Sequence, residues 1–511
     1  MTSVAPPYPP FSLPSGHFLS LPPSYAGPST SPSTSSAQSG GLAPNTASLA
    51  SADFEVDVRT GFLPGSKNVE RLPQPWEIWE EALDAARGTA VGDGLRLGGG
   101  RPKEVLWRAG IEVMAVVDTE ALQTSMGLMR RAHLVLSFLL HFYAHTSPSD
   151  APRPLAIPAS IAIPILQIAP KLGLPPILTY SDTVLYNFLP SRPDASVSIV
   201  NPPERALVTF TNTRSEEQFY VISAQCEIAG AEALRIMRQS LDELFVGDDL
   251  ALRRLAVYLR KLAKQIDRVG DITLSMIQHI DPEEFYHLIR PWFKGGDDGP
   301  GSLGWAFMGV PDEGVAAVAA AENTADRAEG VKRGKLFSGP SAGQSSLIHA
   351  IDIFLTVDHS PSADEVQNEA SFLQRMLEYM PLAHRSFLGH LADHPTPLRP
   401  VITHYAKTHP KLAAAYDLAL DALKRFREKH MRIVSVFIVQ QARRQPSDRI
   451  RVLLGTAEEG EEVEVEVVQA VSVEEMRGTG GSPLFKFLKR CRDNTTRAMI
   501  AAPKGPVYEL K

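Results

Sequence analysis

Apolar side chains recur at intervals of three and four residues over most of the second half of the chain, and this spacing predicts amphipathic helices. One further helix of this kind is expected earlier, at residues 119–144. In the second half, the segments with helical spacing are residues 216–246, 249–279, 281–292, 343–357, 364–377, 384–392, 410–444 and 483–501. The pattern therefore predicts a mainly α protein.

The pattern changes near residue 204. Before this point, short helical patterns alternate with segments punctuated by proline, and residues 206–211 (ALVTFT) alternate as a β-strand does. We therefore expect a small N-terminal domain with α and β structure, residues 53–204. It should pack on a large all-helical domain, residues 205–505.

Two irregular insertions, residues 294–340 and 455–476, interrupt the helical pattern as long loops. Each leads into a motif of small residues, GPSAGQSS at 339–346 and GTGGSP at 478–483. Backbone amides in such motifs can hold a ligand. The two motifs are therefore candidate binding segments.

Residues 1–52 contain no Lys, Arg, Asp or Glu and are crowded with Pro, Ser, Gly and Ala. Such a segment cannot bury enough apolar surface to offset its ordering entropy, so we expect a disordered tail. It also lacks the basic start and unbroken apolar core of a signal peptide. Pro164 and Pro170 interrupt the longest apolar run before it reaches a membrane-spanning length, so no membrane partner is expected.

Composition narrows the class of function. A net charge of −7 and a pI near 6.1, without a long basic run, argue against a nucleic-acid partner. Cys226 and Cys491 are the only cysteines, which excludes a disulfide framework, a CxxC redox pair, a CxxCH haem attachment and a cysteine zinc site. A reduced, cytoplasmic setting is expected. No GxGxxG, P-loop or GxSxG pattern occurs, and His390 with His394 lack a third zinc ligand.

His430 lies within RFREKHMRIVSVFIV, residues 425–439, on an apolar helical face. Five apolar residues share that face: Leu423, Phe426, Ile433, Val434 and Phe437. A buried imidazole needs a backbone carbonyl, a carboxylate or a metal as partner. Arg427, one turn earlier, must be paired if it is buried, and Asp352 in the apolar LIHAIDIFLTV could pair with it. The spacing leaves all three partners of His430 open and permits a haem or metal site.

Four strings, in order and with matching spacing, resemble the indoleamine 2,3-dioxygenases, haem enzymes that open the indole ring of tryptophan. They are SAGQSS (341–346), YMPLAHRSFL (379–388), FREKHMRIV (426–434) and GTGGSPLFKFLK (478–489). Further similar strings are GFLP (61–64), LPPILTYSDTVLYNF (174–188) and RCRDNTTRAMI (490–500). The resemblance covers residues 53–501. The tail and the enlarged 294–336 loop depart from the mammalian pattern, and the sequence looks like a fungal member.

The resemblance implies a small mixed domain packed on a helical domain that binds haem b. It implies that His430 is the proximal ligand of the haem iron, and so the metal-binding residue. Arg427 and Asp352 would pair to hold the ligand helix and the haem edge. The wall of the haem pocket would be formed by Ser341, Ala342 and Gly343.

On the substrate side, the resemblance implies that Arg290 holds the amino-acid carboxylate with two hydrogen bonds. Ser223 would be the small hydroxyl facing the iron, and it is a candidate catalytic residue together with Arg290 and Thr479. The other expected substrate contacts are Tyr180, Val184, Phe219, Tyr220, Phe285, Thr479 and Gly480. Thr183 stands where the mammalian enzymes have cysteine, and Pro340 replaces a glycine.

The implied activity is haem- and O2-dependent cleavage of the indole C2–C3 bond of L-tryptophan to N-formylkynurenine, the start of the kynurenine route towards NAD. We expect a monomer that needs a reductant for ferric haem. The alternatives are a haem-binding paralogue with low turnover and a sensor or interaction protein. Arg290 and Thr479 together favour the enzyme, because a sensor need not keep both.

Overall fold

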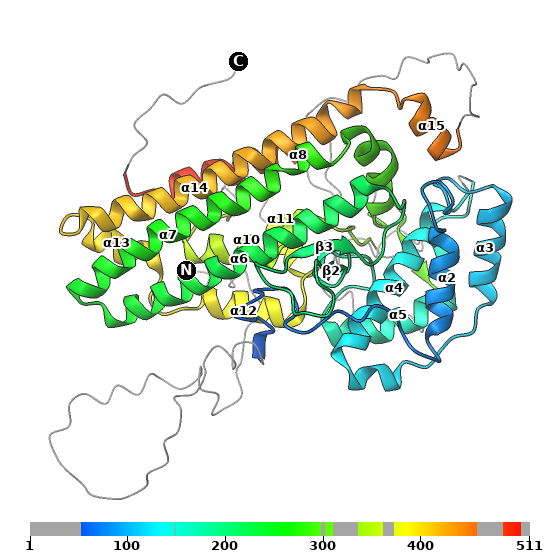
Figure 1. The fold of residues 1–511 in the computed structure, drawn as a ribbon, viewed down its shortest axis with the longest axis horizontal. Coiled ribbons are helices and arrows are strands. Elements are labelled where there is room, and N and C mark those ends of the chain that lie inside the picture. Colours follow the sequence, from blue (N-terminus) through cyan, green and yellow to red (C-terminus); the bar gives the residue numbers. More distant parts are fainter. Residues whose placement is uncertain are drawn as a thin grey trace, which may run out of the picture.

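The computed structural model describes residues 53–148, 150–297, 302–309, 336–360, 372–456 and 484–501, and these residues form a mainly helical fold (Figure 1). The predicted tail, most of the two predicted insertions and the GTGGSP motif lie outside the described residues. Within the described residues, no helix is both long enough and apolar enough to cross a bilayer.

Three long helices, α6 (Arg214–Val246), α7 (Asp249–Leu274) and α14 (Pro410–Val434), lie side by side, with α7 between the other two (Figure 1). A tight turn joins α6 to α7. Gly247 adopts a left-handed φ of 68° there, and the Asp248 side chain accepts a hydrogen bond from the backbone N–H of Ala251 at the start of α7. The apolar stripes of the three helices therefore face one another.

Shorter helices make up much of the rest of this part of the chain. They are α8 (Met276–His279), α10 (Ser346–Phe354), α11 (Phe372–Leu377), α12 (Leu382–Ala392), α13 (Leu398–Tyr405), α15 (Asp448–Leu454) and α16 (Leu484–Arg497). Helix α10 approaches α6 closely because Gly230 of α6 has no side chain: a methyl group at this position would lie 2.2 Å from Leu347. The small residue therefore lets the two helices pack in direct contact.

At one end of the molecule, α2 (Glu77–Arg87), α3 (Pro102–Val113), α4 (Met126–His145) and α5 (Ala159–Leu172) lie together (Figure 1, blue and cyan). Helix α4 is buried on nearly all sides and includes an ion pair. Its Arg131 donates hydrogen bonds of 2.8 and 2.6 Å to Glu80 of α2. These two charged groups can be buried here because each is the hydrogen-bonded partner of the other.

Strands are few and short. β1 (Leu155–Ile157) pairs in parallel with β4 (Trp305–Phe307), and β2 (Phe188–Pro190) pairs antiparallel with β3 (Pro203–Ala206). The predicted boundary at residue 204 falls inside β3, and one hydrophobic core continues from Leu63 to Phe437 across it. Residues 205–505 also include β4, so this region is not wholly helical, and the division into two domains stays a prediction.

The predicted strand at residues 206–211 is wrong beyond Ala206. Side chains, rather than a neighbouring strand, bind its backbone. The Val208 N–H donates to Asn187, and the N–H groups of Phe210 and Thr211 donate to the two carboxylate oxygens of Glu216. The backbone N–H groups of this segment thus find hydrogen-bond acceptors without a strand, although the sequence alternates as a strand does.

The helical spacing located the long helices but not their ends. The predicted helix at 119–144 is divided by Ser125, which caps α4 after a 3₁₀ turn, η1 (Glu120–Thr124). The segments predicted at 281–292, 343–357 and 410–444 contain further turns of other types. These are η3 (Glu284–Ile289), η4 (Arg290–Phe293), η6 (Ala342–Gln344), η7 (Ser435–Val439) and η8 (Gln441–Arg443).

A buried ion pair fixes a π-helical turn, η2 (Ser181–Leu185). His133 Nδ1 lies 2.7 Å from Asp182 Oδ1, and both side chains are fully buried. The other Asp182 oxygen accepts hydrogen bonds from the backbone N–H and the hydroxyl of Thr179. Burial opposes the charged imidazole, but Asp182 and the Pro175 carbonyl outweigh it and raise the pKa of His133. The pair therefore ties η2 to α4.

We predict that His133→Gln lowers the free energy of unfolding by about 3–5 kcal/mol at pH 6, because Asp182 loses its cation. A raised folded-state pKa gives a stabilisation that is complete below the usual pKa of 6.5 and lost as pH rises through the folded value. The difference between parent and variant should therefore shrink from pH 7 to pH 9, as measured by urea unfolding.

His384→Gln is the matched control, because burial lowers the pKa of His384 to about 3 and its imidazole stays neutral throughout this range. The effect of that substitution should be constant from pH 7 to pH 9. A His133→Gln effect that is equally constant would show that the buried imidazole carries no charge.

Candidate functional site

A large cavity lies among α6, α10 and α14, with a volume of about 280 Å³ measured as the space open to the centres of water molecules. Most of its lining is apolar. Of the residues expected from the resemblance, the cavity wall contains Tyr180, Val184, Phe219, Ser223, Phe285, Arg290, Ser341, Ala342, Gly343, Asp352, Arg427 and His430. The structure thus brings together residues from five separated parts of the chain.

Of the three expected residues that remain, one lies in the described part of the chain, outside this wall. Tyr220 is buried behind it, with its hydroxyl donating to Glu216 at 2.8 Å and its ring centroid 6.0 Å from that of Phe219. Thr479 and Gly480 lie outside the described residues. Tyr220 therefore does not line the cavity, where its expected contact with the substrate would be made.

All three π-helical turns in the described part of the chain contribute to the cavity wall. η2 contributes Thr183 and Val184, η3 contributes Phe285, and η7 contributes Phe437 with Ile438. A π-turn holds one residue more than an α-turn and changes the direction of the side chains that follow. These turns are a structural reason why side chains from three separate elements line the same space.

His430 lies in the cavity wall, near the end of α14. Within the described part of the chain, neither ring nitrogen has a hydrogen-bond partner. Burial, with a smaller contribution from the Arg427 cation, lowers the pKa of His430 to about 4, so the imidazole is neutral near pH 7. Of the partners that the sequence left open, the described structure supplies neither a carbonyl nor a carboxylate.

Arg427 and Asp352 form the expected pair, and a third residue joins them. Arg427 donates to Asp352 Oδ1, while His359 Nε2 lies 3.2 Å from Asp352 Oδ2. Burial opposes ionisation of Asp352, but Arg427 and His359 lower its pKa well below the usual range. The carboxylate in turn raises the pKa of His359 to about 9 against the effect of burial. Near pH 7 the cluster therefore contains two cations and one anion.

The turn at residues 341–345 is held against the η2 segment. Gln344 Nε2 donates to the Gly339 carbonyl at 2.9 Å, and Gln344 Oε1 accepts from the Tyr180 N–H at 2.8 Å. His349 Nε2 donates to the Gly343 carbonyl at 2.9 Å. A methyl group at Gly343 would lie 2.8 Å from the Phe372 ring, so a larger residue there would force that ring to move. The small-residue motif is therefore a rigid part of the wall.

On the α6 side of the cavity, aromatic rings lie close to one another, and Ser223 adds a small hydroxyl. The centroid of the Phe219 ring lies 4.9 Å from that of Phe285 and 5.9 Å from that of Phe293. Ser223 donates its hydroxyl to the Phe219 carbonyl at 2.8 Å. Arg290 completes this region, with its guanidinium carbon 5.6 Å from the centroid of the Tyr286 ring. The arrangement suits a flat aromatic ligand with an anionic group.

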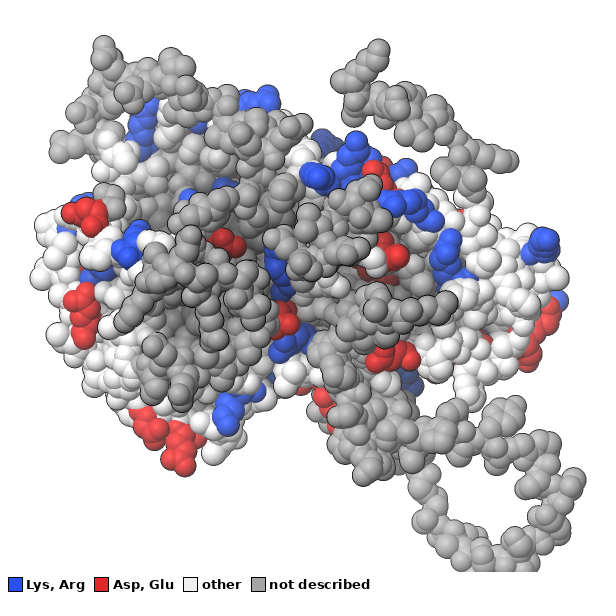
Figure 2. Space-filling view, turned by 180° about the vertical axis from the view of Figure 1, so that it is seen from behind, with Lys and Arg blue, Asp and Glu red and all other residues white. Residues whose placement is uncertain are grey.

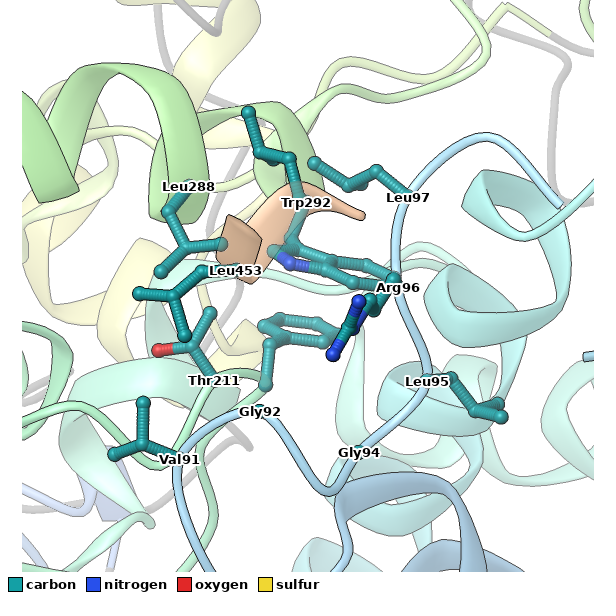
Figure 3. Close-up of a pocket in the computed structure, with 12 residues that line it drawn as sticks. Val91, Gly92, Gly94, Leu95, Arg96, Leu97, Thr211, Leu288, Trp292 and Leu453 are labelled. Atoms are coloured by element: carbon teal, nitrogen blue, oxygen red, sulfur yellow. The ribbon is translucent and has the colours of Figure 1, made fainter. Parts of the chain in front are cut away.

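A second hollow is far smaller. Its volume is about 20 Å³, enough for about one water molecule. Its wall combines Val91, Gly92, residues 94–97, Leu453 and Trp292, and Figure 3 shows how they meet between the N-terminal helices and the rest of the chain. On the face shown in Figure 2, Lys and Arg side chains lie among Asp and Glu side chains. The hollow is much smaller than the large cavity, and neither it nor this surface has the cavity's range of lining side chains.

Comparison with known proteins decides the family. The family model described as "Indoleamine 2,3-dioxygenase" matches residues 50–498. The chain belongs to the indoleamine 2,3-dioxygenase family. Members of this family are haem enzymes that use O2 as a co-substrate.

Named relatives extend over most of this chain. Indoleamine 2,3-dioxygenase 1 of Mus musculus is 29% identical over 452 residues, which are 88% of this chain and 96% of the relative. Indoleamine 2,3-dioxygenase of Saccharomyces cerevisiae is 32% identical over 399 residues, 76% of this chain and 82% of the relative. The "6-hydroxytryptophan 2,3-dioxygenase fscD" of Fusarium equiseti is 28% identical over 459 residues, 88% of this chain and 98% of the relative.

The residues of this indoleamine 2,3-dioxygenase family member fit haem. A neutral imidazole without a protein partner faces a large apolar cavity, and imidazole is a preferred iron ligand. Haem needs only one such ligand from the protein. Within the described ranges, no group of three or more His, Cys, Asp or Glu residues could hold a bare metal ion.

Sequence reasoning missed three polar residues of the site, His359, Gln344 and Glu227. Glu227 follows Ser223 by four residues in α6, so a carboxylate on the same helical face could have been noticed. His359 follows Asp352 beyond the end of α10, where periodicity predicts nothing. Gln344 lies inside the recognised SAGQSS motif, but its role depends on contacts with distant residues.

We predict that Asp352→Asn lowers the free energy of unfolding by about 3–5 kcal/mol at pH 6, because Arg427 would then be buried without its carboxylate. His359→Gln alone should cost about 1.5–3 kcal/mol through loss of a charge-assisted hydrogen bond. In the Asp352→Asn background the same substitution should cost much less, because the carboxylate that keeps His359 protonated is gone and the buried imidazole becomes neutral.

Urea unfolding of the parent, both single variants and the double variant completes this thermodynamic cycle. The decisive observation is the loss of most of the His359→Gln effect in the Asp352→Asn background. If that substitution has the same effect in both backgrounds, the three side chains do not act as one charged cluster.

Proposed function

We propose that the protein cleaves the indole C2–C3 bond of L-tryptophan with O2 and yields N-formylkynurenine, the first step of the kynurenine route towards NAD. Both oxygen atoms enter the product, so turnover consumes no external electrons, and a reductant is needed only to reduce ferric haem. We further propose that the enzyme is a monomer of the cytoplasm. The observation that carries the proposal is the neutral, unpartnered His430 in the wall of the large cavity.

In this proposal His430 holds haem b, whose iron supplies the redox chemistry that lets O2 react with the indole ring. Arg427 and Asp352 position α14, and Ser341, Ala342 and Gly343 form the wall beside the haem. Haem iron would take the lone pair of a His430 ring nitrogen that the protein leaves without a hydrogen bond. This accounts for the cost of keeping a polar ring nitrogen in an apolar cavity.

The remaining lining residues orient the substrate. Tyr180, Val184, Phe219 and Phe285 enclose the indole and exclude water, while Arg290 holds the carboxylate. Ser223 already donates to a backbone carbonyl, so we assign it a steric and positioning role beside the reacting ring rather than proton transfer. Tyr220 would support Phe219 from behind. Thr479 and Gly480 are proposed to close over the amino-acid group.

The substrate itself needs a direct test, since the Fusarium equiseti relative is named for 6-hydroxytryptophan. Purified protein is incubated with ascorbate, methylene blue and L-tryptophan, and N-formylkynurenine is followed by absorbance. Steady formation of the product supports the proposal. Haem-loaded protein that forms no product would favour the alternative of a haem-binding paralogue.

We predict that Arg290→Ala leaves haem content and fold unchanged but lowers kcat/KM for L-tryptophan by about thirtyfold to several thousandfold. The reason is the loss of a charge-assisted carboxylate contact of about 2–5 kcal/mol in a water-poor cavity. Arg290→Lys should recover little of this activity, because an ammonium group cannot form the paired hydrogen bonds of a guanidinium.

Tryptamine, which lacks the carboxylate, is the matched control substrate. Its turnover should hardly respond to Arg290→Ala. Equal losses for tryptophan and tryptamine would assign Arg290 a structural role, and a loss below threefold for tryptophan would remove it from the substrate site.

A further inference from the structure

Glu227 links two parts of the cavity wall that are far apart in the sequence. Its Oε1 atom accepts hydrogen bonds from the Tyr180 hydroxyl at 2.9 Å and from the Ser345 hydroxyl at 2.7 Å. Tyr180 immediately precedes η2, Ser345 immediately precedes α10, and Glu227 belongs to α6. One carboxyl oxygen therefore joins three elements of the wall.

The second oxygen of Glu227 takes no part in this link. Oε2 is buried without a hydrogen-bond partner within the described residues, and only 2% of the surface of Glu227 is exposed. The protein itself thus shields the carboxyl group, so a ligand in the cavity does not need to touch it or to strip water from it. Any effect of Glu227 on a substrate must pass through the side chains that it holds.

Tyr180 is held at both ends. Its backbone N–H donates to Gln344 Oε1 at 2.8 Å, and its hydroxyl donates to Glu227. The bond to Gln344 fixes the backbone but leaves the side-chain torsions free, whereas the bond to Glu227 fixes the far end of the ring. Glu227 thus determines the orientation of an aromatic ring that lines the cavity, in the region that the proposed function assigns to the indole.

Through Ser345, the same oxygen holds the turn at residues 341–345. The Ser345 N–H donates to the Ala342 carbonyl at 3.1 Å, so a shift of Ser345 would also shift this turn. Ala342 and Ser345 both line the cavity. Glu227 therefore sets the position of the Tyr180 ring relative to the turn that is proposed to lie beside the haem.

The charge of Glu227 sets the strength of both hydrogen bonds. Burial raises its pKa to about 7, opposed only by the Ser345 and Tyr180 hydroxyls, and no described charged side chain contributes. Two titratable groups face the carboxyl, the Tyr180 phenol and the neighbouring Cys226 thiol of α6. Burial raises the pKa of Tyr180 well above its usual value and that of Cys226 to about 12, so both stay neutral near pH 7. Hydrogen bonds to an ionised acceptor are about twice as strong as those between neutral groups.

We propose that Glu227 is a positioning residue of the proposed reaction, whose ionised carboxylate holds the Tyr180 ring in place for the indole and so raises the affinity for tryptophan above neutral pH. This inference rests on the proposed function and adds to it a residue that acts on the substrate only through Tyr180. A ring that is already held in its binding orientation loses less conformational freedom when the ligand arrives. Protonation of Glu227 weakens this hold without removing any group that contacts the substrate.

The test uses full-length, haem-loaded ferrous protein without O2. L-Tryptophan is titrated at pH 6 and at pH 8, and the Kd is measured from the change in the haem Soret band. Glu227→Gln keeps the size of the side chain and a neutral acceptor. Its Kd should exceed that of the parent by about fivefold at pH 8, because the charge-assisted bonds are lost. At pH 6, where the parent carboxyl is mostly protonated, the two values should agree within about twofold.

Two further variants locate the effect. Tyr180→Phe removes the donor hydroxyl and keeps the ring, so it should lose the same pH dependence, and adding Glu227→Gln to it should change the Kd little. Thr273→Val is the matched control, because the Thr273 hydroxyl also belongs to the cavity wall but donates to the Val269 carbonyl. It should retain the pH dependence of the parent. Thermal unfolding and the Soret band of each variant monitor folding and haem content.

An infrared difference spectrum between pH 6 and pH 8 observes the carboxyl group without substrate. The C=O stretching band of a protonated carboxyl should be present at pH 6, disappear at pH 8 and be missing from Glu227→Gln. The inference is overturned if this band does not titrate, or if Glu227→Gln changes the Kd equally at both pH values, as a purely structural residue would.

In either of these cases the proposed function stands, provided that tryptophan is bound and oxidised. A haem-loaded parent protein that neither binds nor oxidises tryptophan overturns the proposed function, and this inference with it.

Discussion

The structure depends on keeping one imidazole neutral and without a protein partner inside an apolar cavity. His430 meets this condition because burial and the nearby Arg427 cation both disfavour its protonated form. The condition is costly for an apoprotein, since a polar ring nitrogen in the wall of an apolar cavity has no protein partner within the described residues. In the proposed function, haem iron would bind this nitrogen and offset the cost. Haem binding would thus account for a feature that would otherwise destabilise the fold.

Charged groups around the cavity are paired with one another. Asp352 pairs with Arg427 and His359, so that Arg427 is not left buried without a carboxylate. At another part of the wall, the His133–Asp182 pair fixes η2, and neither of its side chains lines the cavity. Ion pairs therefore position the wall, while the space itself remains largely apolar and suited to haem and an aromatic substrate.

Periodicity predicted the long helices because α6, α7 and α14 are each amphipathic over many turns. It also placed His430 on an apolar face, and recognisable strings supplied the pairing of Arg427 with Asp352. It could not predict the π-turns, because a single extra residue hardly alters an apolar pattern. Nor could it predict that the Asn187 and Glu216 side chains bind the backbone of residues 208–211, since that depends on how this irregular segment folds. His359 escaped notice because it lies beyond the end of α10, where periodicity predicts nothing, whereas Glu227 could have been noticed from its spacing to Ser223.

The identity of the haem ligand is the most direct test of this account. Resonance Raman spectroscopy of the ferrous protein should show an iron–histidine stretching band, and His430→Gly should lose both that band and most of its haem while retaining helical circular dichroism. Added imidazole should enter the vacated space and restore haem binding and an iron–imidazole band. Unchanged haem content and an unchanged iron–histidine band in His430→Gly would contradict the account and assign the iron to another histidine.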